Sequence, residues 1–287
     1  MSDARADAIG GISIAIDVWE LAVIPYLLNN AGTWMGMSKK AIEMLNQIQK
    51  VFLQRILQVK TAAIPLMFWD LGQLLMSNRV LKKKLLLVHH LATLNKKSIG
   101  YQIYYQQKKD SLPGLIEEMK EDLLQFEMTL DGMETFTKKE WKKFTEKNVR
   151  KKNREDLLTM MKSFKKLEVE ELEKEDDGIK PYMKSLSYRD AVLKFKMRAR
   201  VIKTVKTHFK NDKNFTSELW SCLNCSSLDT SFHILHQCPI YENLRKDMNI
   251  DNDEEVVDFF RKVIQRREEK EDDGRETNTV NSNDNRL

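Results

Sequence analysis

The sequence predicts a mainly α-helical protein. Ten glycines and five prolines occur in 287 residues, too few breakers for a turn-rich β fold. Apolar residues recur at intervals of three or four in several stretches, as they do on the buried face of an amphipathic helix. Charged residues make up 32% of the chain, which is above the usual share and favours helices with solvated outer faces.

The first predicted helix covers residues 38–59. Ser38 is a good N-cap because its hydroxyl oxygen accepts hydrogen bonds from the first helical turn. The apolar residues behind it repeat at helical spacing and predict one buried face: Ile42, Leu45, Ile48, Phe52 and Ile56. After a break around residues 61–65, a second helix is expected over residues 73–94 or 77–94.

Further along, a Pro-Gly pair at residues 113–114 marks a junction between helices. Residues 137–140 (Thr-Lys-Lys-Glu) match a capping box and open a long, highly charged helical segment. This segment becomes acidic from Glu168, and Gly178 and Pro181 end it.

These features divide the chain into four expected segments. Residues 1–110 form a helical region, residues 111–185 form charged linker helices, and residues 186–250 hold a basic segment with a Cys/His motif. Residues 251–287 form a charged tail. Because apolar residues are almost absent from about Gln265 onward, we expect the tail to be largely disordered.

All three cysteines lie in one 17-residue window, with a histidine between them. The window contains Cys222, Cys225, His233 and Cys238. Zinc prefers thiolate and imidazole ligands in a closed tetrahedron when its role is structural, and this set supplies four such ligands. No coordination position is left for water, so the sequence predicts a structural Zn²⁺ site whose binding is coupled to folding of the segment.

Other interpretations of these residues are weaker. His236 could replace His233, but only one residue would then separate it from Cys238. A redox Cys-x-x-Cys pair would need a thioredoxin-like βαβ context, which the sequence does not show. Three free cysteines and a surface histidine remain the plain alternative. The odd cysteine count implies no disulfide framework, which suits a reducing intracellular compartment, cytoplasm or nucleus.

Residues 230–241, Thr-Ser-Phe-His-Ile-Leu-His-Gln-Cys-Pro-Ile-Tyr, resemble the end of non-LTR (LINE-type) retrotransposon reverse transcriptases. Those proteins carry a CCHC zinc knuckle after the polymerase. Three earlier stretches are similar, in the same order, to the opening of the thumb, its continuation, and the basic segment before the knuckle: residues 22–34, 68–94 and 195–200. The resemblance spans residues 18–245 and implies that residues 1–110 are thumb-like.

The sequence also departs from that family. The polymerase palm, with its aromatic-x-Asp-Asp motif, is absent, and so is the endonuclease domain. Asp-Asp occurs only at Asp176-Asp177 and Asp272-Asp273, both in charged runs, whereas two-metal phosphoryl transfer needs carboxylates held on a packed element. The resemblance therefore implies a nucleic-acid-binding, C-terminal fragment of an RNA-directed DNA polymerase that lacks catalytic residues of its own.

Positive charge is concentrated directly before the Cys/His motif. Residues 188–214 contain nine basic and two acidic residues, a net charge of +7, whereas the whole chain carries +5. This is the expected footprint of phosphate contacts to RNA or DNA. The expected contact residues are Lys194, Lys196, Arg198, Arg200, Lys203, Lys206, Lys210 and Trp220. Trp220 could stack on unpaired bases together with Phe232 and Tyr241.

Alternatives stay open for this basic segment. Ser187 predicts the start of a helix, but alternation around residues 193–201 also permits a short strand. The charges could line a solvated helix face and the aromatics a small core. The lysine runs at 82–84 and 142–143 are expected to be solvated helix faces.

Residues 9–28 are apolar enough to consider as a membrane span. They contain Asp17, Glu20 and Pro25, each unfavourable in hydrocarbon, so no membrane association is expected. Three hypotheses follow for function: a nucleic-acid-binding reverse transcriptase fragment, a zinc-stabilised protein-interaction module, and a degenerate element copy without function. The oligomeric state is not indicated.

Overall fold

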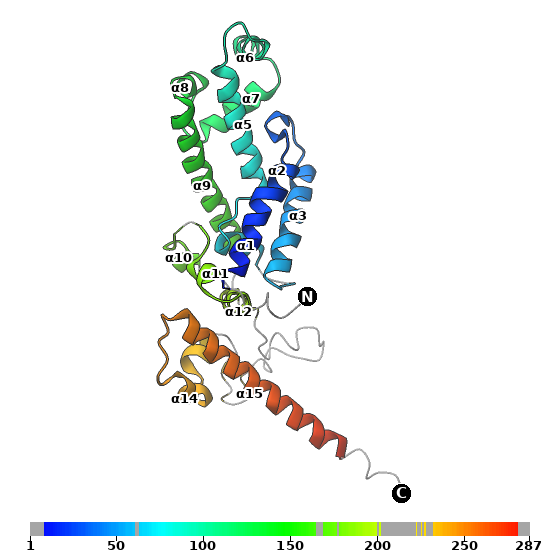
Figure 1. The fold of residues 1–287 in the computed structure, drawn as a ribbon, viewed down its shortest axis with the longest axis vertical. Helices are drawn as coiled ribbons and strands as arrows, with labels where there is room; N and C mark the ends of the chain where they lie inside the picture. Colours follow the sequence, from blue (N-terminus) through cyan, green and yellow to red (C-terminus); the bar gives the residue numbers. More distant parts are fainter. Residues whose placement is uncertain are drawn as a thin grey trace. The chain divides into compact units, whose positions relative to one another are not determined.

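The computed structural model describes residues 9–60, 63–164, 169–176, 178–199, 201, 222, 225, 227 and 232–280. The chain divides into two compact units (Figure 1). The larger unit comprises residues 12–180, and the smaller unit comprises residues 1–11 and 181–287. The described residues form helices and two isolated β-bridges, with no strand. The mainly α fold class is therefore confirmed.

Helices build the larger unit. They are, in chain order, α1 (Gly11–Val18), a π-helical turn (Trp19–Val23), α2 (Ile24–Leu27), a 3₁₀ turn (Ala31–Thr33), α3 (Lys39–Ile56), α4 (Ile64–Asp70), α5 (Met76–Ala92), α6 (Ile99–Asp110), α7 (Leu115–Leu124), α8 (Leu130–Glu134), α9 (Lys138–Lys162) and α10 (Val169–Leu172).

Several predicted helix ends are confirmed. The Ser38 hydroxyl accepts a hydrogen bond from the backbone N–H of Ala41 at 3.2 Å, and the capping box at residues 137–140 is complete. Helix α4 occupies part of the expected break around residues 61–65, and α9 ends at Lys162, well before the acidic run. In α3, Ile48 is exposed instead of buried, while Leu53 is fully buried.

Helix α5 is the centre of the larger unit because it contributes to two apolar cores. One core joins it to α6, α7, α8 and α9 around Trp141, whose indole N–H donates to the backbone oxygen of Leu85 at 3.0 Å. The other joins the start of α5 to residues 19–31 around Trp19 and Met76. The boundary expected at residue 110 therefore lies inside this unit, since α6 and α7 both contact α5.

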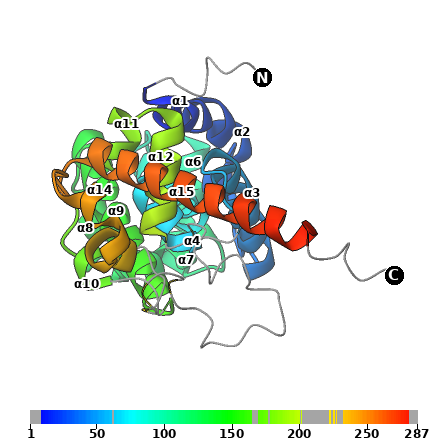
Figure 2. The same cartoon turned by 90° about the horizontal axis from the view of Figure 1, so that it is seen from below.

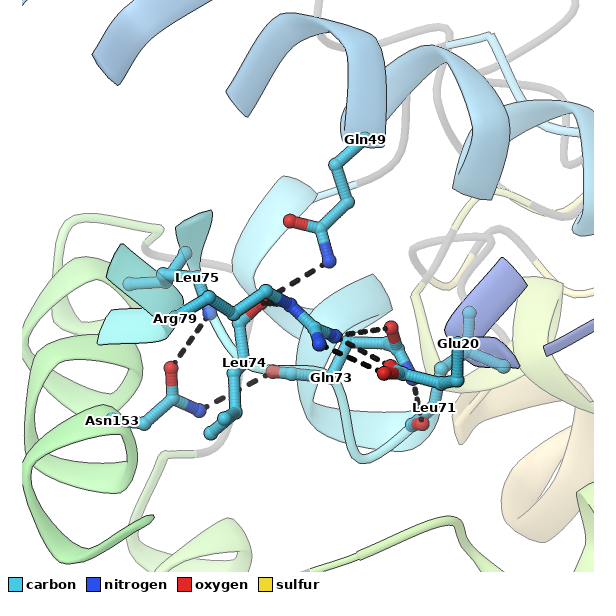
Figure 3. Close-up of polar contacts among 8 residues, drawn as sticks. All are labelled: Glu20, Gln49, Leu71, Gln73, Leu74, Leu75, Arg79 and Asn153. Carbon is cyan, nitrogen blue, oxygen red and sulfur yellow. Dashed lines mark hydrogen bonds and ion pairs between the residues drawn. The ribbon is translucent and has the colours of Figure 1, made fainter. Parts of the chain in front are cut away.

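A network of polar side chains holds the loop between α4 and α5 (Figure 3). Asn153 on α9 accepts from the backbone N–H of Leu75 at 2.8 Å and donates to the backbone oxygen of Gln73 at 3.2 Å. Gln49 on α3 donates to the backbone oxygen of Leu74 at 3.1 Å. Side chains from separate helices thus satisfy backbone groups that no helix can pair at this buried position.

Arg79 completes this network with a bidentate ion pair. Its guanidinium donates to the two carboxylate oxygens of Glu20 at 2.8 and 2.5 Å and, through Nε, to the backbone oxygen of Leu74 at 3.1 Å. The planar guanidinium matches both oxygens of a carboxylate, which fixes orientation as well as charge. The pair ties the π-helical turn at residues 19–23 to α5.

The acidic segment after α10 returns to α4. Leu71 and Ile179 form an isolated antiparallel bridge, and the backbone N–H of Lys180 donates to the backbone oxygen of Asp70 at 2.9 Å. The Trp69 indole donates to the Glu175 carboxylate at 3.1 Å. Glu175, Ile179 and Lys180 therefore pack against the end of α4 as part of the larger unit, and the segment is not a linker detached from it.

The smaller unit contains α11 (Pro181–Ser185), α12 (Tyr188–Arg198), a π-helical turn (His233–Gln237), a 3₁₀ turn (Pro239–Tyr241), α14 (Glu242–Arg245) and α15 (Asp253–Val280). Helices α12 and α15 lie side by side (Figure 2). The Ser187 hydroxyl caps α12, so residues 188–198 form a helix and the strand alternative is wrong there.

The expectation of a disordered tail from residue 251 is wrong for most of that segment. Helix α15 runs through Val280. Its first half carries an apolar stripe at helical spacing, Val256, Phe259, Phe260 and Val263, and every member is at most 2% exposed. Burial of this stripe supplies the tertiary packing that a highly charged helix needs to be stable. Residues 281–287 lie outside the described part of the chain.

Candidate metal centre

The four predicted metal ligands lie together in the smaller unit. One ligand atom from each of Cys222, Cys225, His233 and Cys238 lies within 4.8 Å of the others. The sulfurs of Cys222 and Cys238 are 3.8 Å apart. Two thiolates on one tetrahedral Zn²⁺ would be about 3.8 Å apart, because each Zn–S bond is about 2.3 Å. The donor set and its spacing therefore fit zinc.

A tight turn presents the first two ligands. The backbone N–H of Cys225 donates to the backbone oxygen of Cys222 at 3.3 Å, and the backbone N–H of Cys222 donates to the oxygen of Ser227 at 2.6 Å. These two hydrogen bonds keep the backbone of Cys222 and Cys225 close together. The pKa of the Cys225 thiol is lowered, chiefly by a hydrogen bond with the Ser227 backbone, which favours the thiolate that binds metals.

A π-helical turn presents the other two ligands. The backbone N–H of Cys238 donates to the oxygen of His233 at 2.8 Å, an i to i+5 bond. This bond brings residues five apart onto one side of the backbone, which is the spacing of the second ligand pair. The His233 Nε2 atom lies 3.2 Å from the Cys225 sulfur, so the two halves of the motif meet.

Arg245 braces the second half of the site from α14. Its guanidinium donates to the backbone oxygens of Ile234 at 2.9 Å and Cys238 at 2.5 Å. Both oxygens belong to the turn that carries His233 and Cys238. This arginine orients ligands without touching the ligand atoms, and the ligand spacing that revealed the site gave no signal for it.

The candidate site is buried against α12 and α15. Cys222, His233 and Cys238 are each at most 3% exposed, and Cys225 is partly exposed. The surrounding apolar cluster joins the cysteines to Met197 of α12 and to the apolar stripe of α15. None of the three cysteines forms a disulfide. The site is thus the core of the smaller unit, and this core includes residues of α15 beyond the expected segment boundary at residue 250.

The structure favours one of the two candidate histidines as a metal ligand. His233 is 3% exposed and lies beside the Cys225 sulfur. His236 is exposed, and its ring lies 4.5 Å from the ring of Phe232. Phe232, which was considered for base stacking, is 52% exposed, whereas Tyr241 is buried.

The predicted phosphate contacts on α12 are either paired within the protein or partly buried. Lys194 forms an ion pair with Asp253 at 2.8 Å. Lys196 is partly buried, and this burial lowers the pKa of its ammonium group. Arg198 is partly buried as well. The other five predicted contacts lie outside the described residues: Arg200, Lys203, Lys206, Lys210 and Trp220.

No second metal site emerges in the described part of the chain, since no other group of three or more His, Cys, Asp or Glu side chains lies close enough to hold an ion. Every described helix is too short or too polar to span a membrane. Comparison with protein-family models, with curated proteins and with solved structures finds no match to this chain.

Proposed function

We propose that this chain is a nucleic-acid-binding protein whose smaller unit is held together by a structural zinc ion. The observation that carries the proposal is the meeting of four buried or half-buried ligand atoms within 4.8 Å. The segment that leads into this site, residues 188–214, has a net charge of +7. A rigid metal centre would anchor the end of that cationic segment and reduce the entropy lost when it binds a phosphate backbone.

The proposal also concerns the kind of protein from which this chain derives. The order of the thumb-like stretches, the basic segment and the Cys/His motif supports a C-terminal fragment of a non-LTR retrotransposon reverse transcriptase. In such a parent enzyme, this part would hold RNA or DNA and leave polymerisation to a separate palm. The chain alone would bind nucleic acid without polymerase activity.

A second candidate function is protein interaction through an apolar helix face. Ile14, Val18 and Leu21 recur at helical spacing on the N-terminal helices and are 59, 57 and 80% exposed. An exposed apolar row of this kind is typical of a protein contact. Lys194, being paired with Asp253, also offers less charge to phosphate than its sequence position suggests.

Zinc content and nucleic-acid binding of the full chain test the proposal together. We expect one zinc ion per chain, loss of zinc in Cys225→Ser, and retention in the control His236→Ala, because His236 is exposed and outside the ligand group. Binding to labelled RNA and DNA should weaken steeply as salt increases. Zinc without nucleic-acid binding would support the protein-interaction alternative, and absence of zinc would refute the metal centre.

The zinc measurement requires a protein that includes α15. A fragment that ends at residue 250 would lack the apolar stripe of α15, which packs on the ligand residues. The full chain is therefore the appropriate sample.

A further inference from the structure

A column of lysines runs along the solvent side of α9 in the larger unit and turns by about 40° around the helix axis at each four-residue step. Lys139, Lys143, Lys147 and Lys151 follow one another at four-residue intervals and are all exposed. At about 1.5 Å of rise per residue, neighbours stand about 6 Å apart and the column is about 18 Å long. The next position along this line is Glu155, which ends the column.

The buried stripe of α9 fixes the direction of this column. Trp141, Thr145, Val149 and Asn153 are buried at the same four-residue interval. The lysines are offset from them by two residues, which is a rotation of about 200° around the helix. Packing of the stripe against α4 and α5 therefore turns the lysine column outward.

Two of the acidic residues near the column are committed elsewhere, whereas Glu127 and Glu155 line a pocket together with Lys151. The Glu140 carboxylate accepts hydrogen bonds from the backbone N–H and hydroxyl of Thr137 at 2.9 and 2.7 Å. Glu146 pairs with Lys82 and with Arg150. No ion pair within the described residues involves any of the four column lysines. The four lysines are thus exposed and form no ion pair with the part of the chain that the structure describes.

We propose that this lysine column binds the phosphate backbone of a nucleic-acid duplex without reading its sequence. A duplex carries one phosphate per about 3.4 Å of axis on each strand, so an 18 Å column faces about five phosphates of one strand. Lysine ammonium groups act there as point charges on flexible stems. The column contains no apolar or aromatic side chain, so it lacks the anchors that a membrane surface would require.

This inference adds a second binding surface to the proposed function and rests on residues that the zinc centre does not include. It differs from the sequence-based expectation that Lys142 and Lys143 belong to an ordinary solvated face. The new observation is that four lysines are exposed over three helical turns opposite the buried stripe of α9, with no ion pair to the described residues.

The test compares two full-length variants with equal charge changes. The column variant replaces Lys139, Lys143, Lys147 and Lys151 by Gln. The control variant replaces Lys39, Lys40, Lys96 and Lys97 by Gln, four exposed lysines away from α9. Lysine and glutamine have similar helix propensities, so circular dichroism should show both variants folded.

Binding to a DNA duplex of about 20 base pairs is then measured across a salt series. We expect the column variant to bind more than tenfold more weakly at about 0.1 M salt and to lose about 3 to 4 from the slope of log K against log salt. The control variant should keep the slope of the unaltered chain. An equal change in both variants, or no change in the column variant, would overturn the inference.

A third variant separates this inference from the proposed function. Lys203→Gln, Lys206→Gln and Lys210→Gln remove charge from the basic segment before the zinc site. If that variant loses binding while the column variant retains it, the proposed function stands and the inference fails. If only the column variant loses duplex binding, the inference stands. Equal loss of binding to duplex and to phosphatidylserine vesicles would also overturn it, in favour of a membrane surface.

Discussion

Gly72 lies where two backbone segments of the larger unit approach each other closely. Its φ is +60°, and a Cβ atom there would lie 2.6 Å from the backbone of Gly178 and Ile179. Asn153 has an equally restricted role, because its amide serves the loop between α4 and α5 from a position only 3% exposed. The residues at positions 72 and 153 therefore each contribute to the packing of the larger unit.

Gly72→Ala should destabilise the larger unit by about 2–4 kcal/mol, since it adds both left-handed strain and a backbone clash. The matched control is Gly36→Ala. Gly36 has φ +56° but only one distant contact at 4.0 Å, so strain alone should cost about 1–2 kcal/mol there. Urea unfolding monitored by tryptophan fluorescence compares them, and equal losses would contradict the close approach.

Asn153→Ala should cost about 2–3 kcal/mol, because it leaves the buried N–H of Leu75 and oxygen of Gln73 without their partner. The control is Asn148→Ala on the same helix, whose side chain donates to its own helix at Phe144. Thermal unfolding should separate the two variants by several degrees. Indistinguishable midpoints would mean that water replaces the Asn153 amide.

Helices α9 and α15 differ in whether local or distant contacts stabilise them. Helix α9 begins at a capping box that is complete within four residues. Helix α15 begins with acidic residues. Four of its apolar side chains pack in the cluster that contains the candidate metal centre, and this packing positions the helix. Residues close together in sequence therefore determine where α9 begins, whereas the stability of α15 depends on packing with residues distant in sequence.

Removal of the cap should weaken the start of α9. Thr137→Ala should cost about 1 kcal/mol, the usual loss for such a substitution. Hydrogen bonds from Thr137 lower the pKa of Glu140 below its usual 4.5. A lowered folded-state pKa stabilises the protein above pH 4.5, and this stabilisation is lost as pH falls through the lowered value. Unfolding measured between pH 7 and 3 should therefore be less acid-sensitive in the variant.

Packing of α15 should control how tightly the centre holds zinc. Phe260→Ala removes a fully buried ring from the cluster that contains Cys222 and Cys238. Because metal binding is coupled to folding, we expect faster zinc loss to a chromogenic chelator. Arg266→Ala, at an exposed position on the same helix, is the control and should lose zinc at the normal rate. Identical rates would show that the four ligands hold zinc independently of α15.

The chain as a whole contains two compact units with different cores. The larger unit has ordinary apolar cores around α5, whereas the smaller unit is centred on the four candidate metal ligands. Small cores commonly need such a metal for stability. The two units should therefore respond differently to metal removal.

Chelation of zinc should unfold the smaller unit and leave the larger unit folded. Trp19, Trp34, Trp69 and Trp141 lie in the larger unit. In a Trp220→Phe background, tryptophan fluorescence reports on that unit alone. We expect a chelator to reduce the far-ultraviolet helical signal without moving the fluorescence-detected midpoint. A shift of that midpoint would show that the units unfold together.

The sequence alone predicted those features that depend on residues close together in the chain. The helical class, the caps at Ser38 and Thr137, and the cluster of four candidate metal ligands are all of this kind, because a few neighbouring residues contain the whole chemical pattern. His233 was preferred over His236 by spacing, and the observed π-helical turn provides the geometric reason.

Other features required the folded chain, because they depend on which distant surfaces meet. The packing of α15, the position of Gly72 against Gly178, and the ion pair of Lys194 with Asp253 join residues far apart in sequence. The same applies to the lysine column of α9. Its sequence spacing is visible in advance, but packing of the opposite stripe against α4 and α5 is what leaves those charges facing solvent.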